Sequence, residues 1–373
     1  MRSQSISKFL QERIDANDFP SAVYLVAENG EIVFQDALGF AVVEPEKIEA
    51  TIDTIYDLAS LTKPLITGLL AAKLIEDKEM NADDSVGDLL NEFYISGNAE
   101  ISVNELLTHT SGLPAWRPFY LLVQHPEQVL TEIAETLSSD EQEPVTYSDL
   151  NFLTLQNIIE RIWDDSFAQI ADREVISKLG LTKTFFNPLR SVDRGTIAAS
   201  EYGNEYEKNT CIELGYLNEN DHENGFRDYQ IWGEVHDGNA WFMGGAAGHA
   251  GLFSTAEEVF RIAEQFLPNR TKLLKPETTD LFSTNFTEGM NEDRSIAFQL
   301  SSTEGSTAGT TIPPQSFGHN GFTGTSLWID PIHDRVFVLL TNRTHVHPLP
   351  FVNINSVRRR FHDLAVRELD ENS

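Results

Sequence analysis

The sequence contains one cysteine, Cys211, and no long apolar run. A single cysteine excludes an intrachain disulfide, a cysteine-based metal cluster and a redox-active cysteine pair. Cys211 lies in a polar stretch without a recognisable partner, so we expect a passive thiol rather than a nucleophile. The absence of any run of 18 apolar residues argues against a transmembrane helix. The first ten residues also lack the apolar segment of a secretory signal. These absences predict a cytoplasmic location.

Basic residues are scarce. The 373 residues include 27 Lys and Arg against 58 Asp and Glu, which gives a formal net charge of -31. Such a surface repels phosphate backbones and anionic lipids, so we expect no nucleic-acid partner and no membrane partner. The acidic residues are spread along the chain, as in a surface that keeps a protein in solution. Adaptation to high salt is the alternative. If stability in thermal unfolding does not rise with salt, that alternative is wrong.

Strand patterns are found at both ends of the chain. Asn29-Gly30 separates two apolar runs and is a strong hairpin signal. Together the two ends predict one antiparallel sheet flanked by helices, which is an α+β fold. The expected elements are a helix at about 4–17, strands at 21–28, 31–38, 315–322, 325–330 and 336–342, and helices at 60–75 and 353–369.

The middle of the chain is mainly helical. We expect a single domain, 1–373, with an α/β part at 1–75 and 245–373 and an inserted helical part at 76–244. The segment 190–235 is acidic and rich in Asn, Gly and Tyr, which indicates a surface excursion that acts as a lid or rim. The candidate helices are 102–107, 126–138, 150–163, 167–178 and 256–266.

A serine and a lysine occur three residues apart in Ser60-Leu61-Thr62-Lys63, at the start of the predicted helix 60–75. Positions i and i+3 share a helix face, so the lysine amine can reach the serine hydroxyl. A serine hydroxyl needs such a base to become a nucleophile. The helix N-terminus offers free N–H groups to a developing oxyanion. Alone, the pair is better explained as a helix-capping serine followed by a surface lysine.

Two further motifs follow in the sequence. Tyr147 and Asp149 lie in a loop before a helix, where a phenol beside a lysine ammonium can shuttle a proton. The alternative for Tyr147 is a buried side chain that structures a turn. His319 stands in Gly318-His319-Asn320-Gly321, which we place at the beginning of a strand. Glycines there let a substrate approach the strand edge, and the alternative for His319 is an ordinary loop histidine.

The motifs S-x-x-K, Y-x-D and H-x-G occur in the order found in the serine β-lactamase and penicillin-binding-protein superfamily, and the chain resembles its class C-like and esterase branch. The resemblance covers nearly the whole chain and is weakest at about 190–235. Three further segments share it: Leu106 to Pro114 (LLTHTSGLP), Gly244 to Thr255 (GGAAGHAGLFST) and Gly318 to Arg343 (with GHNGFTGTSLWIDP and LLTNR).

The resemblance implies a β-lactamase-like fold and a covalent acyl-enzyme mechanism. Ser60 would be the acylated nucleophile, and Lys63 would be the general base that shares a proton with Tyr147. The N–H groups of Ser60 and Phe322 would form the oxyanion hole. The candidate site residues are Ser60, Lys63 and Tyr147 for catalysis, and His319, Gly321, Phe322 and Asp149 for the oxyanion hole and substrate binding.

Two residues depart from the family's usual motifs. Asp149 replaces the usual Asn, and it either pairs with Lys63 or only caps the next helix. His319 replaces the usual third-motif Lys, and a largely neutral imidazole attracts a substrate carboxylate less than an ammonium does. This favours an esterase acting on small carboxylic esters. The alternatives are a β-lactamase or D-Ala-D-Ala carboxypeptidase, and a catalytically silent binding protein of the same fold.

We expect a small-molecule ester or amide substrate, no cofactor and no metal. His345 and His347 have the spacing of a metal pair, but no carboxylate partner is evident. His236, Asp237 and His249 either line the cleft or structure its loops. The oligomeric state does not follow from the sequence.

Overall fold

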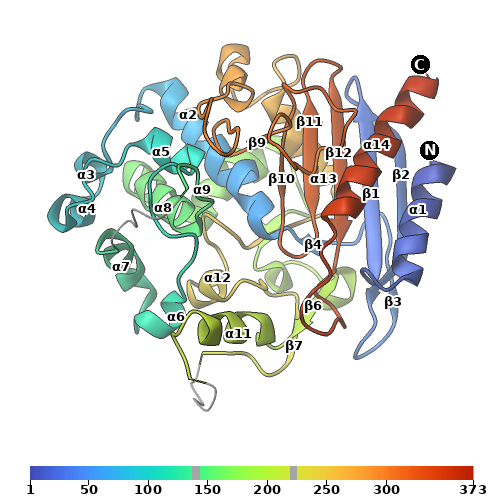
Figure 1. Cartoon of the computed structure of the whole chain (residues 1–373), viewed down its shortest axis with the longest axis horizontal. Coiled ribbons are helices and arrows are strands. Elements are labelled where there is room, and N and C mark those ends of the chain that lie inside the picture. The colour runs from blue at the N-terminus through green and yellow to red at the C-terminus, as the bar shows by residue number, and fades with distance from the viewer. Residues whose placement is uncertain (137–142, 219–224, 373) are drawn as a thin grey trace.

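The computed structural model describes residues 1–136, 143–218 and 225–372. A seven-stranded sheet runs in the order β3-β2-β1-β12-β11-β10-β9, and all its neighbouring strands pair antiparallel. Strands from the two ends of the chain therefore lie side by side, as predicted (Figure 1). The strands are β1 (Ser21–Glu28), β2 (Glu31–Val42), β3 (Ile48–Glu49), β9 (Gln299–Leu300), β10 (Phe317–Asn320), β11 (Ser326–Asp330) and β12 (Arg335–Thr341).

The interior strand β1 is buried on both faces, and its successive side chains point to opposite sides of the sheet. Tyr24 and Val26 belong to one core, beneath α1 (Gln4–Asp15) and α14 (Asn355–Asn372). The intervening residues, such as Leu25, belong to the larger core on the other face. α1 and α14 pack against each other, and both chain termini lie on the same side of the sheet (Figure 1).

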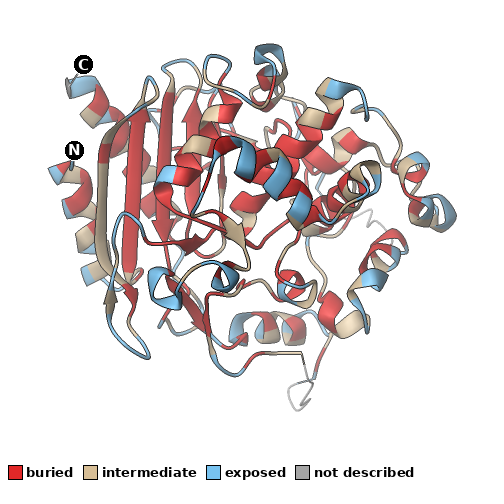
Figure 2. Ribbon diagram, turned by 180° about the vertical axis from the view of Figure 1, so that it is seen from behind, coloured by how far each residue is buried: buried red, intermediate tan, exposed pale blue. Residues whose placement is uncertain are grey.

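The remaining helices cover the second face of the sheet and extend away from it. They are α2 (Leu69–Asp77), α3 (Val86–Leu89), α4 (Asn91–Ser96), α5 (Val103–Thr108), α6 (Phe119–Leu122), α7 (Val129–Ala134), α8 (Asp149–Trp163), α9 (Phe167–Ala171), α10 (Ser177–Leu179), α11 (Glu205–Glu213), α12 (Gly238–Phe242) and α13 (Ala256–Ala263). β1, β11 and β12 are almost fully buried, β2 is mostly half-buried, and exposed residues gather on the outer turns, loops and helix faces (Figure 2). No helix within 1–136, 143–218 and 225–372 is long and apolar enough to cross a membrane.

Two small sheets complete the fold. One runs in the order β4 (Tyr56–Asp57), β8 (Leu252–Ser254), β5 (Phe185–Phe186), and the other pairs β6 (Ala199–Tyr202) with β7 (Gln230–Trp232). β5, β6 and β7 thus lie within the inserted region predicted to be mainly helical. The division of the domain into these two parts remains a prediction.

The predicted single helix at 60–75 is divided into three. A 3₁₀ turn spans Ala59–Leu61, a wider π-type segment spans Lys63–Gly68, and the α-helix begins only at Leu69. Pro64, at the start of the π-type segment, has no N–H to donate. The spacing that predicted a helical face still brings Lys63 beside Ser60, although the turn between them is not α-helical.

The segment 190–235 is more than the surface excursion we expected. Its described residues include a strand pair and a helix, and Ile197 and Trp232 pack into the main core. Residues 219–224 lie outside the described part of the chain. The expectation of a rim holds for α11, since several of its residues line the central cavity.

Candidate active site

Ser60 follows the short strand β4, which pairs with β8. The buried carboxylate of Asp57 accepts hydrogen bonds from the backbone N–H of Ala59 and of His236, each at 2.8 Å. Ala59 has φ +48°, in the left-handed region that an alanine rarely adopts. The backbone just before Ser60 is therefore strained and held by Asp57, which is common at functional sites.

Lys63 lies between Ser60 and Asp149. Its Nζ is 3.0 Å from Ser60 Oγ and 2.6 Å from Asp149 Oδ1, and its side chain is fully buried. Burial lowers the pKa of Lys63, but the charges of Asp149 and Tyr147 and the hydrogen bonds to both together more than offset this, so that the pKa lies above its ordinary value. Lys63 is thus a buried ammonium at neutral pH. Of the two roles left open for Asp149, pairing with Lys63 is the one observed, although Asp149 also begins α8.

Tyr147 lies against the same lysine, with Lys63 Nζ 4.8 Å from the centre of its ring. Burial raises the pKa of the Tyr147 phenol, while the charge of Lys63 and hydrogen bonding with Lys63 and Ser60 oppose that rise. The rings of His109 and His319 lie 4.6 and 5.7 Å from the Tyr147 ring, centre to centre. The structure therefore brings Ser60, Lys63, Tyr147, Asp149 and His319 together, as the sequence predicted.

His109 was not among the predicted site residues. It ends α5 with φ +61°, and its Nδ1 accepts a hydrogen bond of 3.0 Å from the N–H of Ser148. This bond fixes the loop that carries Tyr147, whose ring packs against the imidazole at an interplanar angle of 37°. One indication was present in the sequence, because His109 lies inside a segment that resembles the family without carrying a known role.

The loop after β10 is fixed beside Ser60 by two threonines. Thr323 Oγ1 donates to the carbonyl oxygen of Asp57 at 2.7 Å, and Thr325 Oγ1 donates to that of Leu58 at 3.0 Å. A Cβ at Gly321 would lie 2.0 Å from Thr325 Oγ1 and 2.5 Å from the Leu58 oxygen, so only glycine fits there.

The N–H groups predicted to form an oxyanion hole are both free of other bonds. Neither Ser60 N–H nor Phe322 N–H donates a hydrogen bond within the described residues. Ser60 and Phe322 also line the same cavity, which has a volume of about 750 Å³. Both donors are thus available to an oxygen atom of a bound substrate.

His319 lies near the end of β10 rather than at its beginning, because it is the third residue of a strand that ends at Asn320. Its Nδ1 is 2.9 Å from the carbonyl oxygen of Asn320, to which it donates. Burial and the charges of Lys63 and Arg294 hold the pKa of His319 well below its ordinary value. His319 is therefore neutral, with Nε2 as an acceptor, and does not supply the positive charge of a third-motif lysine.

Three arginines line the cavity, and the sequence analysis named none of them as a site residue. Arg343 Nε donates to the carbonyl oxygen of Phe322 at 2.7 Å, and Arg358 Nη2 donates to that of Gly321 at 2.8 Å.

Arg294 contacts Glu292 through Nη2, but its buried Nε and Nη1 have no partner within the described residues. Arg294 also lies over the Tyr147 ring, at 5.4 Å. This side of the cleft is cationic despite the net charge of -31.

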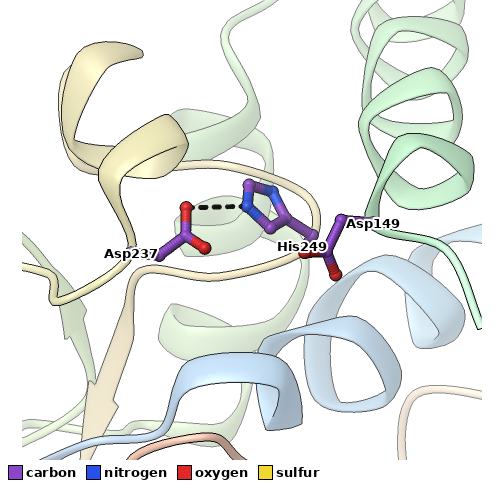
Figure 3. Close-up of side chains that lie close together, drawn as sticks. All are labelled: Asp149, Asp237 and His249. Atoms are coloured by element: carbon purple, nitrogen blue, oxygen red, sulfur yellow. Dashed lines mark hydrogen bonds and ion pairs between the residues drawn. The ribbon is translucent and has the colours of Figure 1, made fainter. Parts of the chain in front are cut away.

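One group of side chains in the cleft offers donor atoms suited to a metal ion (Figure 3). Donor atoms of Asp149, Asp237 and His249 lie within 4.8 Å of one another, and His249 Nε2 is 2.9 Å from Asp237 Oδ1. Burial opposes ionisation of Asp237, yet His249 and Lys63 hold its pKa well below the ordinary value. Lys63 already places a positive charge 2.6 Å from Asp149, so a cation would have to compete with it.

His345 is not free to ligate a metal with His347. Its Nε2 accepts a hydrogen bond from the N–H of Val43, and its Nδ1 donates to the carbonyl oxygen of Ser200, each at 2.9 Å. Both ring nitrogens are thus used by the fold. Cys211 is fully buried, and burial raises the pKa of its thiol, which agrees with a passive role.

Comparisons with known proteins agree with this geometry. A model of the Beta-lactamase family matches residues 6–358. A protein of Escherichia coli K12 named "Putative D-alanyl-D-alanine carboxypeptidase" is 29% identical over 371 residues, covering 92% of this chain and 83% of the relative.

Two solved structures share the fold at low sequence identity. A class C beta-lactamase from Rhodobacter sphaeroides has a TM-score of 0.72 at 17% identity, covering 98% of this chain and 99% of its own. EstCE1, described as a hydrolase with promiscuous acyltransferase activity, has a TM-score of 0.70 at 20% identity, covering 96% of this chain and 98% of its own.

Proposed function

The chain belongs to the beta-lactamase family of serine hydrolases, and we propose that it works through an acyl-enzyme on Ser60. The observation that carries this proposal is the contact series from Ser60 Oγ to Lys63 Nζ, at 3.0 Å, and on to Asp149 Oδ1, at 2.6 Å. It connects the hydroxyl through Lys63 to a carboxylate that can accept a proton, and the surroundings of the hydroxyl also hold free N–H groups.

In the proposed acylation step, Ser60 Oγ forms a bond to the carbonyl carbon of the substrate. Lys63 is already protonated, so it takes the serine proton only as it passes one of its own to Asp149. The N–H groups of Ser60 and Phe322 stabilise the oxyanion. When the tetrahedral intermediate collapses, Tyr147 protonates the leaving group and regains its proton from Lys63, which recovers one from Asp149. Water then cleaves the acyl-enzyme by the same route in reverse.

For the substrate, we propose a peptide that ends in a carboxylate, of the D-alanyl-D-alanine type named for the relatives. The cationic side of the cleft supports this choice. Arg294 has two unpaired buried nitrogens and Arg358 lines the same cavity, and guanidinium groups bind carboxylates in a paired geometry. Arg294 and His319 both lie against the ring of Tyr147, so Arg294 would supply the charge that this histidine lacks.

Hydrolysis of small carboxylic esters, the function favoured by the sequence, remains the second candidate. Its support is the neutral state of His319, because a small ester needs no cationic anchor. The solved hydrolase with acyltransferase activity has the same fold. The predicted cytoplasmic location is also part of this proposal, since it would separate the protein from cell-wall peptides.

A pair of peptides distinguishes the two candidates. We would measure kcat/KM for an N-acylated D-Ala-D-Ala peptide and for its C-terminal amide, in wild type, Arg294→Gln and the exposed control Arg190→Gln. The proposal predicts that kcat/KM is about tenfold or more higher for the peptide with the free carboxylate than for its amide. Arg294→Gln should lose this preference through a higher KM, and Arg190→Gln should keep it. Turnover of p-nitrophenyl esters without peptide cleavage would support the second candidate. Absence of turnover and of Ser60 adducts would support a silent binding protein.

A further inference from the structure

Part of the cavity wall is formed by α11, in the segment that least resembles the family. Tyr206, Glu207, Thr210 and Leu214 of this helix and its C-terminal end line the cavity that holds Ser60. Glu207 is only 7% exposed, so a carboxyl group is buried in the wall of the cleft. The proposed mechanism gives this carboxyl group no role.

One oxygen of Glu207 is used by the fold and the other is not. Oε1 accepts a hydrogen bond of 2.7 Å from the N–H of Gly238, the first residue of α12. Oε2 is buried without a hydrogen-bond partner among the described residues. A Cβ at Gly238 would lie 2.1 Å from Oε2, so the carboxyl group packs tightly against this glycine. The side chain is thus held in place with one acceptor left over.

The charged groups around Glu207 are already bonded to other partners. Asp237 contacts His249 at 2.9 Å, and His236 contacts Glu201 at 2.7 Å. The buried Arg227 donates to Asn204 Oδ1 and to the carbonyl oxygens of Val235 and His236.

Glu207 itself makes no ion pair within the described part of the chain. Tyr120 is also close: its hydroxyl contacts Cys211 Sγ at 3.6 Å, and burial and the interaction with Glu207 raise the pKa of its phenol. Burial and the charge of Asp237 raise the pKa of Glu207 to about 7. The charge of Arg227 acts on Glu207 without a direct ion pair, and a buried carboxyl group that lacks a direct ion pair is costly unless a ligand provides one.

We propose that Glu207 binds a protonated amine on the acyl portion of the substrate, with Asp237 as a second carboxylate in the same cavity. An ammonium group has three donors and a positive charge, so it satisfies the free oxygen of Glu207 and pairs with the carboxylate. The arginine-lined side would bind the carboxylate of the leaving group. The preferred substrate is therefore an aminoacyl compound with a free amine. This inference rests on the proposed function, because it needs acyl transfer to Ser60.

The test uses matched substrates that differ only in the charge of the amine. We would prepare ω-aminoacyl-D-alanine compounds of graded chain length and their N-acetylated counterparts, and the same acyl groups as thioesters. Release of D-alanine or thiol would be measured for wild type, Glu207→Gln and Glu213→Gln. Glu213 is exposed on the same helix and serves as the matched control.

The inference predicts that at least one chain length is preferred with a free amine over its acetylated form, by about tenfold to hundredfold in kcat/KM. Glu207→Gln should lower kcat/KM for the free-amine compounds more than for the acetylated ones and so remove this preference, and Glu213→Gln should retain it. Equal turnover of both forms by the wild type, or an equal loss of both in Glu207→Gln, would overturn the inference. Failure of every substrate to acylate Ser60 would instead overturn the proposed function.

Discussion

Replacing Asp149 by asparagine removes the carboxylate that pairs with Lys63 and keeps nearly the same shape. Lys63 Nζ is 2.6 Å from Asp149 Oδ1, and the lysine side chain is fully buried. Removing one partner of a buried ion pair typically costs about 3–5 kcal/mol. The substituted amide would still offer an acceptor oxygen, and Asp149 is partly exposed. We therefore expect Asp149→Asn to lower the free energy of unfolding by about 2–3 kcal/mol at pH 7.

The effect on catalysis distinguishes two roles for the lysine. If Lys63 passes a proton to Asp149, the variant has no acceptor and must first deprotonate Lys63. Without Asp149, burial lowers the pKa of Lys63, so the ordinary value of about 10.4 is an upper limit and the neutral form at pH 7 is at least about one part in 10³. We therefore expect kcat at pH 7 to fall by about 10²–10³-fold, and the rising limb of the pH profile to move to alkaline pH.

The measurement is kcat against pH from 6 to 10 for wild type, Asp149→Asn and the exposed control Asp83→Asn. Urea unfolding at pH 7 on the same proteins checks that the variant is folded during the assay. A pH profile that moves to lower pH in Asp149→Asn, with equal or faster turnover at pH 7, would refute the relay. It would show instead that Asp149 restrains a lysine that acts alone as the base.

Two further predictions concern other parts of the molecule. Thr323→Val removes the 2.7 Å hydrogen bond to the Asp57 carbonyl oxygen, so we expect a loss of about 1 kcal/mol in urea unfolding and a lower kcat with little change in KM. An unchanged kcat would show that this loop does not position the oxyanion hole. Burial lowers the pKa of His362 to about 4, so its contribution to stability is present above pH 6.5 and is lost as the pH falls toward 4. From pH 7 to pH 5 this loss amounts to about 2 kcal/mol. In urea unfolding, the fall in the free energy of unfolding between pH 7 and pH 5 should therefore be about 2 kcal/mol smaller for His362→Gln than for wild type.

The residues that the sequence located best are those in short local motifs. Ser60 and Lys63 are three residues apart, so the chain itself brings them together, and the likeness to the family supplied Tyr147 and His319. Even there, the turn that carries the serine is 3₁₀ and a π-type segment begins at the lysine, where one α-helix was expected. Local spacing thus predicted the contact but not the geometry of the turn.

The residues that the sequence did not locate act across long separations. Arg294 lies over the ring of Tyr147, which is far from it in the sequence, and Glu207 bonds to the start of a different helix. Neither belongs to a motif, and each looks like an ordinary surface charge in the sequence. The pairing of Asp149 with Lys63 was one of two options from the motif alone, because only packing places the start of α8 against the lysine.

The central claim is that Ser60 is the acylated nucleophile. The most direct test is intact-protein and peptide mass spectrometry after incubation with an alkyl p-nitrophenyl phosphonate, which transfers its phosphonyl group to an activated serine. We expect one adduct per chain, located on Ser60 and absent from Ser60→Ala, with slower labelling in Lys63→Ala. An adduct on another residue, or equal labelling of Ser60→Ala, would contradict the account.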